Sequence, residues 1–268
     1  MPQEPPHGKH VGDLGCAQAL TVSIVSHAQE AWLPGLLAQL AQAQPGTIAH
    51  VIVTHNVHQT TPALALASPH WPFRLTELVN PVALGFGANH NQAFELADTP
   101  LFCILNPDIS IPDPQVWAAL ASCASRTETG CAFPILVNRD GSVQDSVRSV
   151  PTPWALLRRR AFQLADTRFD WASAAFWLVP SAVFKELRGF DTRYFMYCED
   201  VDFCMRLRLR GMELAQVTIP VIHLAQRNSH RRWQHLAWHL RSLLRLWTQP
   251  VIWAYLRGVR ASGVGGLR

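Results

Sequence analysis

The sequence predicts an α/β protein in which strands alternate with helices around a largely parallel sheet. Three observations favour this class: β-branched apolar runs recur in the first half, helical patterns separate them, and 49% of the 268 residues are hydrophobic. A chain of this length and composition can bury a full core, which excludes disorder as its main state. Ligands bind outside the carboxyl ends of the strands in such sheets, so functional residues are expected there.

Strands and helices follow one another regularly in the first half. Four strands are expected, at 20–26, 50–54, 73–79 and 101–105. Helices are expected between them, at 32–43 and 88–97. The carboxyl ends of these strands place Ser26, residues 54–56 and residues 106–108 at a single edge of the sheet.

The second half has a less regular pattern. Asp140-Gly141 is typical of a hairpin turn between extended arms. The other expected elements are a strand at 169–180, a short helix at 181–187, a helix that ends at Gly211, strands at 214–220 and 221–225, and helices over 231–260 with a break near Pro250.

Composition restricts the cellular setting. The net charge is +4, with many of the arginines between 227 and 268, so an anionic partner such as a phosphate, a lipid headgroup or a nucleic acid fits. The six cysteines form no CxxC pair and lie mostly in apolar runs, which predicts reduced thiols and no disulfides. Residues 1–19 read as a disordered lead-in without a signal peptide, and no apolar run reaches transmembrane length. We expect a cytoplasmic protein.

A carboxylate at the end of the fourth strand is a candidate metal ligand. Asp108, in Asn106-Pro107-Asp108, could bind a hard divalent cation that would draw a diphosphate to the same edge. The alternative is a cap for the helix that follows Pro112, although Asp113 can already supply it. The metal and capping interpretations have about equal weight from local sequence alone.

A second acidic group precedes a helix. Glu199 and Asp200 could simply favour the helix N-terminus electrostatically. The surrounding run RYFMYCED is rich in aromatic and apolar residues, however, where desolvation can raise a carboxyl pKa enough to make a general base. Asp202 and Arg206 lie four residues apart, which indicates a structural ion pair.

Two further motifs each have a structural and a functional interpretation. His223 lies in the apolar stretch PVIHLA, where a lone histidine is more often a core residue than a ligand, but its neutral imidazole could coordinate the same ion as Asp108. The stretch GFGANHN at 85–91 either makes a turn or offers backbone and amide groups to a phosphate or ribose.

Taken in order, these motifs resemble the family-2 glycosyltransferases with the GT-A fold, in particular the bacterial rhamnosyltransferase-like branch. The resemblance spans about residues 20–230, and the run at 189–211 is its most specific part. The matching stretches are VSIVSH (22–27), NPVALGFGANHNQA (80–93), FCILNPDISIP (102–112), DGSVQDSVR (140–148), FDWASAAFWLV (169–179), GFDTRYFMYCEDVDFCMRLRLRG (189–211) and VIH (221–223).

The resemblance implies a Rossmann-like mixed sheet flanked by helices, a C-terminal helical extension and a metal-dependent transfer reaction. It implies that Asp108 and His223 hold Mg²⁺ or Mn²⁺, that Asp200 deprotonates the acceptor hydroxyl, and that Glu199 supports Asp200 or contacts the acceptor. The residues expected to bind the nucleotide sugar are Ser26, His27, His55, Asn56, Gly87, Asn91, Asn106 and Arg148. Asp170 and Trp171 are expected at the acceptor, although core packing explains Trp171 equally well.

Two departures from the family pattern bear on specificity. Relatives usually read valine-aspartate-asparagine after the second strand, with the carboxylate on the pyrimidine imide, whereas this chain has Thr54-His55-Asn56. His55 is the candidate replacement, which leaves the base open. The stretch ASAA at 172–175 replaces a more glycine-containing version, which would narrow the acceptor site.

The last segment, 231–268, is basic and amphipathic. Leu236, Leu240 and Leu244, with Leu243 and Trp247, fall on one helical face. We expect the first helix to dock on the core and the basic end to contact a membrane surface. The predicted organisation is therefore a lead-in at 1–19, a catalytic domain at 20–230 and this helical segment.

The sequence thus predicts an inverting glycosyltransferase that moves a sugar, with rhamnose as a candidate, from a dTDP- or UDP-linked donor. The expected acceptor is a hydroxyl of a cell-surface glycan or of a polyprenyl-linked saccharide. Peripheral contact with the inner face of the cytoplasmic membrane is a further candidate interaction. No nucleic-acid partner is expected. One alternative is a degenerate GT-A domain that binds nucleotide sugar or lipid without transfer. A nucleotidyltransferase would need a glycine-rich, basic loop after the first strand, and SHAQEAW is not one.

Overall fold

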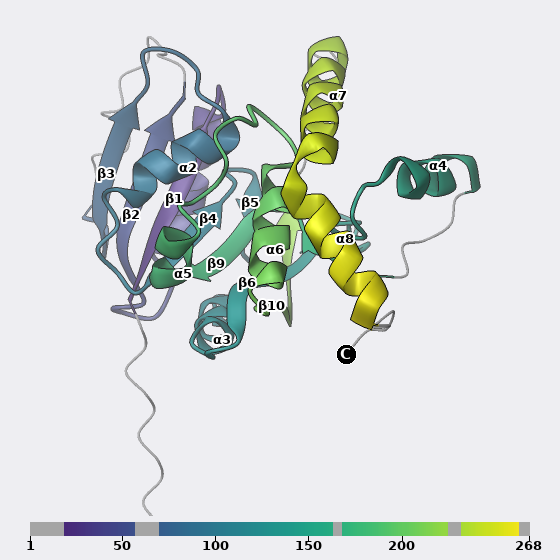
Figure 1. Cartoon of the computed structure of the whole chain (residues 1–268). Helices are drawn as coiled ribbons and strands as arrows, with labels where there is room; N and C mark the ends of the chain where they lie inside the picture. Colours follow the sequence, from purple (N-terminus) through teal and green to yellow (C-terminus); the bar gives the residue numbers. More distant parts are fainter. Residues whose placement is uncertain (1–18, 57–69, 163–167, 225–231, 263–268) are drawn as a thin grey trace, which may run out of the picture.

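A mixed eight-stranded sheet forms the centre of the molecule (Figure 1). The computed structural model describes residues 19–56, 70–162, 168–224 and 232–262. The strand order in the sheet is β3-β2-β1-β4-β9-β6-β10-β5, and β7 and β8 form a separate two-stranded sheet. The strands are β1 (Leu20–Ser26), β2 (Ile48–His55), β3 (Arg74–Val79), β4 (Leu101–Leu105), β5 (Ile109–Ser110), β6 (Thr129–Val137), β7 (Val147–Arg148), β8 (Trp171–Ala172), β9 (Phe176–Pro180) and β10 (Glu213–His223).

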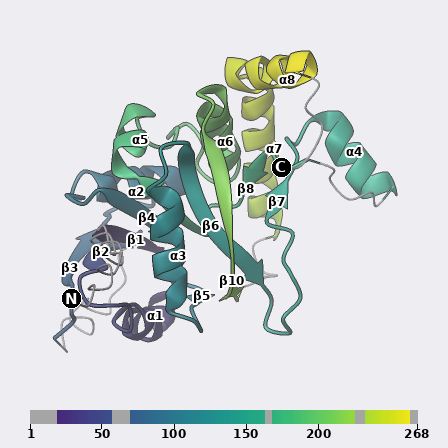
Figure 2. The same cartoon turned by 90° about the horizontal axis from the view of Figure 1, so that it is seen from below.

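Helices cover both faces of this sheet, as Figure 2 shows. The first face carries α1 and α3, and the second carries α2, α5 and α6. The helices are α1 (Leu33–Leu40), preceded by the 3-10 turn η1 (Glu30–Trp32), α2 (Phe86–Phe94), α3 (Gln115–Ala124), α4 (Pro153–Phe162), α5 (Ser181–Glu186), α6 (Glu199–Leu209), α7 (Arg232–Thr248) and α8 (Pro250–Ser262).

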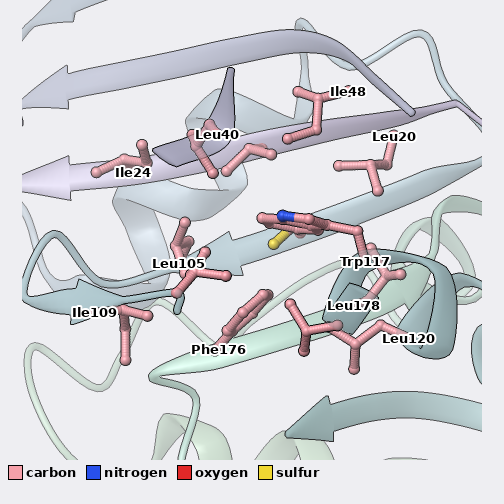
Figure 3. Packing of buried hydrophobic residues seen from close by; sticks show 14 of the residues in the cluster. Leu20, Ile24, Leu40, Ile48, Leu105, Ile109, Trp117, Leu120, Phe176 and Leu178 are labelled. Carbon is pink, nitrogen blue, oxygen red and sulfur yellow. The ribbon is translucent and has the colours of Figure 1, made fainter. Parts of the chain in front are cut away.

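Strand β4 explains why the chain folds into three layers. All five of its residues are buried, and their side chains alternate between the two hydrophobic clusters on either face of the sheet. Leu105 faces the cluster under α3, where Trp117 lies 5.1 Å from Phe176 between ring centroids (Figure 3). Phe102 and Ile104 face the opposite cluster, beneath α2 and α5.

Parallel pairing aligns the functional ends of the first strands, as predicted. Strand β1 pairs in parallel with β2 and β4, with Ser26 opposite His55 and Ile24 opposite Leu105. Strand β9 then runs antiparallel to β4, and β10 runs parallel to β6, which makes the sheet mixed. The residues that follow β1, β2 and β4 consequently lie at one edge.

The second half differs more from the sequence prediction. The expected strand at 169–180 is divided into β8 and β9, and the two expected strands at 214–225 form one strand, β10. Strand β6 was not predicted, because Gly130 and Pro134 lie within it and both residue types weaken a strand signal. The sheet accommodates Pro134 where the register with β10 shifts, between Val217 and Pro220.

The break near Pro250 is confirmed, and the two C-terminal helices are built into the core. Leu243, Leu246 and Ile252 are buried in the cluster that also holds α6. Tyr255 of α8 donates a hydrogen bond to Asp170 at 2.8 Å. Within the described residues, no helix combines the length and apolar character needed to cross a membrane. The expected lead-in, apart from its last residue, and residues 263–268 lie outside the described residues.

Candidate active site

The short strand β5 brings Asp108 next to His223. Ile109 pairs with His223 in the antiparallel β5–β10 ladder, and the Asp108 carbonyl accepts a hydrogen bond from the Leu224 N–H at 2.9 Å. This register leaves His223 Nε2 3.5 Å from Asp108 Oδ1. The other ring nitrogen, Nδ1, lies 2.9 Å from Gln144 Oε1. The predicted meeting of Asp108 and His223 is therefore present.

The chemistry of this pair fits a divalent cation. A carboxylate and an imidazole are donors that Mn²⁺ accepts, and Mg²⁺ is commonly bound through one or two carboxylates with substrate phosphates completing its shell. In the part of the chain that the structure describes, no group of three or more histidine, cysteine, aspartate or glutamate side chains is arranged for a metal. Asp108 and His223 therefore form a pair, without a third side chain of these types beside them among the described residues. Capping is assigned to Asp113 instead, whose Oδ1 accepts the Gln115 N–H at 2.9 Å.

A second pair of carboxylates begins helix α6 after a strained turn. Tyr197 and Cys198 have φ values of 72° and 67°, in the left-handed region that residues with a side chain seldom adopt. Each such residue costs about 1–2 kcal/mol, so neighbouring structure must hold the turn. Glu199 and Asp200 follow immediately as the first two residues of the helix.

Burial separates the acid strengths of these two carboxyls. It raises the pKa of Glu199 to about 8, with a further contribution from the charge of Asp200. It raises the pKa of Asp200 only to about 6, because hydrogen bonds from the Val201 and Ala174 N–H groups and the positive charge of Arg148 stabilise the carboxylate. Of these two neighbouring carboxyls, Asp200 is thus the stronger acid, and Glu199 holds its proton more tightly. Glu199 Oε2 is buried without a hydrogen-bond partner.

One short segment, 172–175, is hydrogen-bonded to Asp200 and to Asn106, which precedes Asp108 by two residues. Ala174 donates its N–H to Asp200, and the Ala175 carbonyl accepts the Asn106 N–H at 2.9 Å. Ala174 and Ala175 are buried in the two core clusters. That the stretch 172–175 narrows the acceptor site stays a prediction.

Helix α7 contacts the strained turn and stabilises it. Ser242 donates a hydrogen bond to the Met196 carbonyl at 2.7 Å, and Tyr197 Oη lies 2.8 Å from His235 Nδ1. The rings of Phe195 and Trp238 are 5.0 Å apart. Three consecutive residues of the turn, 195–197, are thus fixed by one face of α7.

Comparison with known proteins decides the family. No protein-family model matches the chain. The rhamnosyltransferase WbbL of Escherichia coli K12 is 30% identical over 184 residues, which cover 60% of this chain and 69% of the relative. The chain belongs to the rhamnosyltransferase-like family-2 glycosyltransferases.

A second relative and solved structures agree with this assignment. An N-acetylglucosaminyl-diphospho-decaprenol L-rhamnosyltransferase of Mycobacterium tuberculosis is 28% identical over 185 residues, and the match covers 58% of this chain but only 59% of that protein. The mannosyltransferase PcManGT of Pyrobaculum calidifontis, solved with GDP-Man and Mn²⁺, superposes with a TM-score of 0.64 at 16% identity, over 94% of this chain and 77% of that one. Glucosyl-3-phosphoglycerate synthase of M. tuberculosis, solved with Mg²⁺ and UDP, gives 0.56 at 15% identity, over 80% and 74%. These likenesses confirm the GT-A fold.

In this glycosyltransferase, Arg148 lies near enough to Asp200 for its charge to stabilise that carboxylate, and Trp171 lies next to Arg148. They face each other across β7 and β8, and the guanidinium lies 5.8 Å from the centroid of the indole ring. Arg148 Nε donates to the Asp145 carbonyl at 3.0 Å, and the Trp171 indole N–H donates to the Ser149 carbonyl at 2.9 Å. Both side chains remain partly exposed, so contact with a diphosphate or an acceptor sugar remains open to them.

Asp170 occupies a different place from the one predicted. Its side chain is buried and accepts hydrogen bonds from the Val150 N–H, from Arg168 and from Tyr255 at 2.7–2.9 Å. With these partners, Asp170 joins the β7–β8 sheet to α8 of the glycosyltransferase. A direct contact with the acceptor, as the sequence suggested, is at odds with this arrangement.

His55 lies between two carboxylates that sequence reasoning missed. Its Nε2 is 2.8 Å from Glu77 Oε2, and its Nδ1 is 4.0 Å from Glu30 Oε1. Ser26 is fully buried and donates its hydroxyl to Glu30 at 3.0 Å. The glycosyltransferase therefore still has carboxylates next to position 55. The pairing of β2 with β3 brings Glu77 next to His55, and no motif in the sequence predicts this contact.

Asn56 uses its side chain to hold the loop before α2. Its Oδ1 accepts the Leu84 N–H at 2.8 Å, and its Nδ2 donates to the Leu84 carbonyl at 2.9 Å. Asn80 and His27 are further neighbours, at 3.2 and 3.3 Å from the amide. Asn56 and His27 thus shape this edge of the glycosyltransferase, and nucleotide contact by either stays a prediction.

Asn91 and Gly87 serve the packing of α2 in a similar way. The Asn91 amide makes two hydrogen bonds with the backbone of Phe190, at 2.8 and 2.9 Å. A Cβ on Gly87 would lie 2.5 Å from the Phe190 Cβ, and the Phe86 N–H donates to the Phe195 carbonyl. Residues 190–195 therefore cover this end of α2, and nucleotide contact by Gly87 or Asn91 stays a prediction.

Proposed function

We propose that the protein is an inverting, metal-dependent rhamnosyltransferase. In this proposal it moves rhamnose from a dTDP- or UDP-linked donor to a hydroxyl of a lipid-linked saccharide or cell-surface glycan. The observation that carries the proposal is that one segment, 172–175, is hydrogen-bonded both to Asp200 and to Asn106, two residues before Asp108, which in turn lies next to His223. The rhamnosyltransferase relatives support the choice of sugar.

Asp200 is the proposed general base. A sugar hydroxyl is a weak nucleophile near neutral pH, so a carboxylate within hydrogen-bond reach must accept its proton as the new bond forms. A pKa raised to about 6 makes Asp200 a better base than an ordinary aspartate while keeping it ionised at pH 7. Direct attack by the activated hydroxyl inverts the anomeric carbon, and the protonated Glu199 beside it can donate a hydrogen bond to the acceptor.

Asp108 and His223 are the proposed ligands of Mg²⁺ or Mn²⁺. A bound cation supplies charge neutralisation for the diphosphate as it leaves. Arg148 adds a guanidinium that can bind phosphate oxygens in bidentate fashion. Structural neighbours solved with Mn²⁺ and GDP-Man, or with Mg²⁺ and UDP, support a metal in this fold.

The proposed acceptor is carried on a lipid, at the inner face of the cytoplasmic membrane. The name of the mycobacterial relative includes a diphospho-decaprenol carrier. In this chain, one face of α7 exposes Trp233, Leu236, Leu240 and Leu244, and the whole of 231–268 contains seven arginines and no acidic residue. Tryptophan, leucine and arginine on one helix suit an anionic lipid surface. We retain 20–230 as the proposed catalytic domain and 231–268 as the proposed membrane-facing segment docked on it.

Nucleotide titration tests the donor and metal sites. We would measure binding of dTDP, UDP and GDP by calorimetry with and without Mn²⁺, using the full chain, the Asp108→Ala variant and an Asp98→Asn control at an exposed site. The expected result is Mn²⁺-dependent binding of one nucleotide that Asp108→Ala loses and Asp98→Asn keeps. Binding of no nucleotide would favour the degenerate alternative.

A variant of the base tests catalysis separately. Asp200→Asn is expected to lower transfer by a factor of about 10² or more, because general base catalysis contributes about 10²–10⁴. Nucleotide affinity should change little, since the substitution leaves the proposed metal ligands, Asp108 and His223, unaltered. Full transfer activity in Asp200→Asn would exclude Asp200 as the base.

A further inference from the structure

Gln144 is the residue that contacts His223 from behind the proposed metal site. It lies in the hairpin after β6, where Val137 bridges to Val143, and its side chain reaches the end of β10. Gln144 Oε1 is 2.9 Å from His223 Nδ1, while His223 Nε2 faces Asp108 Oδ1 at 3.5 Å. The imidazole is thus held between an amide and a carboxylate.

The orientation of the Gln144 amide follows from its other neighbours. One end lies 2.8 Å from the His223 carbonyl oxygen and 2.9 Å from Asn138 Oδ1. Asn138 is oriented in turn, because its Nδ2 donates to the Ser142 hydroxyl, which donates to Asp140. Two acceptors at one end identify that end as the NH₂ group, so the carbonyl oxygen must face His223 Nδ1.

A carbonyl oxygen at Nδ1 determines where the ring carries its proton. Only an N–H can donate to that oxygen, so the neutral imidazole is the Nδ1–H tautomer. The Nε2 lone pair then faces the Asp108 carboxylate, and two acceptors at 3.5 Å repel each other unless a cation lies between them. The geometry around Gln144 therefore prepares both ligand atoms for the same ion.

We propose that Gln144 is a positioning residue that fixes His223 in the Nδ1–H tautomer and so presents Nε2 to a divalent cation shared with Asp108. This inference rests on the metal-dependent reaction proposed above. Outer hydrogen-bond partners of this kind orient ligating histidines, and their loss commonly weakens metal binding by about 10–100-fold.

Histidine NMR on the metal-free protein tests the tautomer directly. We would label the full chain with ¹⁵N-histidine, assign His223 by comparison with a His223→Gln variant, and record spectra at mildly alkaline pH. Wild type should show a protonated Nδ1 and an unprotonated Nε2. Gln144→Ala should lose this preference, while Gln144→Glu should keep it, because a carboxylate also accepts the Nδ1 proton. A wild-type His223 protonated at Nε2 would overturn the inference.

Mn²⁺ affinity tests the consequence for the metal. Gln144→Ala is expected to bind Mn²⁺ about 10-fold more weakly than wild type, and Gln144→Glu should recover most of the loss. The matched control is Gln216→Ala, because Gln216 lies at an exposed position in β10, the strand that ends at His223. Its Mn²⁺ affinity should equal that of wild type. Equal Mn²⁺ affinity in wild type and Gln144→Ala would overturn the inference. Wild type that shows the expected tautomer but binds no Mn²⁺ would instead contradict the metal dependence under the proposed function.

Discussion

Two adjacent residues, Glu199 and Asp200, acquire different chemistry from their surroundings. Glu199 is 5% exposed, with one oxygen lacking a partner, whereas Asp200 receives two backbone hydrogen bonds and the field of Arg148. The sequence could predict a desolvated acidic pair from its aromatic neighbours. It could not predict which member keeps the proton, because Ala174 and Arg148 come from a distant part of the chain.

The pKa of Glu199 makes a prediction about stability. Its pKa is about 8 in the folded protein, against an ordinary value of 4.5, so between these pH values the folded state binds a proton that the unfolded state has lost. The free energy of unfolding therefore falls as the pH rises through this interval. Glu199→Gln removes the effect, and its stability relative to wild type should increase from pH 4.5 to 8 by at most about 5 kcal/mol.

Denaturant unfolding of wild type and Glu199→Gln across this pH range measures the difference. Glu186→Gln is a suitable control, because that side chain is 64% exposed on α5. A stability difference that does not change with pH would contradict a raised pKa at Glu199.

Several candidate residues show how far sequence can predict a site. The pairing of Asp108 with His223 was expected from family resemblance, and the structure brings the two together. Asp170 and Asn91 were expected to contact substrate, yet both are occupied by partners far along the chain, Tyr255 and Phe190. Motifs identify a residue type at a position, whereas competition among its hydrogen-bond partners is decided only by the folded chain.

At the scale of elements, α7 acts as a brace for the turn that precedes the base. The turn stores unfavourable backbone energy at Tyr197 and Cys198, and α7 contributes the contacts that offset it. Ser242→Ala leaves the Met196 carbonyl without its partner. We expect a loss of stability of about 1–3 kcal/mol and a lower kcat, because the orientation of Asp200 depends on the turn.

Thr248→Ala is the matched control for this prediction. Its hydroxyl donates to the Arg245 carbonyl within the same helix at 2.7 Å, so its loss leaves the turn untouched. Steady-state kinetics and thermal unfolding of both variants provide the comparison. Equal kcat in Ser242→Ala and Thr248→Ala would show that the brace has no role in catalysis.

Helix packing makes a second prediction at this scale. A methyl group on Gly87 would collide with Phe190, so Gly87→Ala should destabilise the protein by about 1–3 kcal/mol. Gly35, in α1, has no neighbour within 4 Å of an added Cβ, and Gly35→Ala should stabilise it by up to about 1 kcal/mol. Calorimetric unfolding measures the stability of the two variants. Equal changes in stability would contradict close packing at Gly87.

The elements also show where sequence patterns fail. Strand β4 is a continuous apolar run and β1 is rich in β-branched residues, and both were predicted with their observed bounds. Strand β6 was missed because it contains Gly130 and Pro134. Its place beside β10 depends on pairing between residues that are 83 to 85 positions apart in the chain. Long-range pairing can override weak local propensity, and a single sequence does not reveal it.

At the scale of the whole molecule, the exposed face of α7 is the feature that remains unexplained by packing. Trp233 is 84% exposed and Leu244 is 61% exposed, although the opposite face of the same helix is well packed. If this face contacts lipid, a double Leu240→Glu, Leu244→Glu variant should lose binding to vesicles that contain anionic lipid. Folding should be unaffected, because both leucines point to solvent.

Vesicle sedimentation compares this variant with wild type and with Leu209→Glu. Leu209 is also exposed, at 46%, but it lies at the end of α6 away from the proposed surface. Neutral vesicles separate charge attraction from apolar insertion. Equal sedimentation of wild type and the double variant with anionic vesicles would exclude this face as a membrane contact.

The two faces of α7 together limit how far the proposed base, Asp200, can lie from a lipid surface that α7 contacts. Successive side chains on a helix are rotated by about 100°, so Trp233, Leu240 and Leu244 lie on the face opposite to His235, Trp238 and Ser242. The second set contacts the turn before Asp200. A helix is about 10 Å thick. If α7 rests on a bilayer, the reacting hydroxyl is held close above the lipid surface, within reach of the first sugars on a carrier and far from the growing end of a long polymer. This enzyme would then act early in glycan assembly and add one residue before chain extension begins.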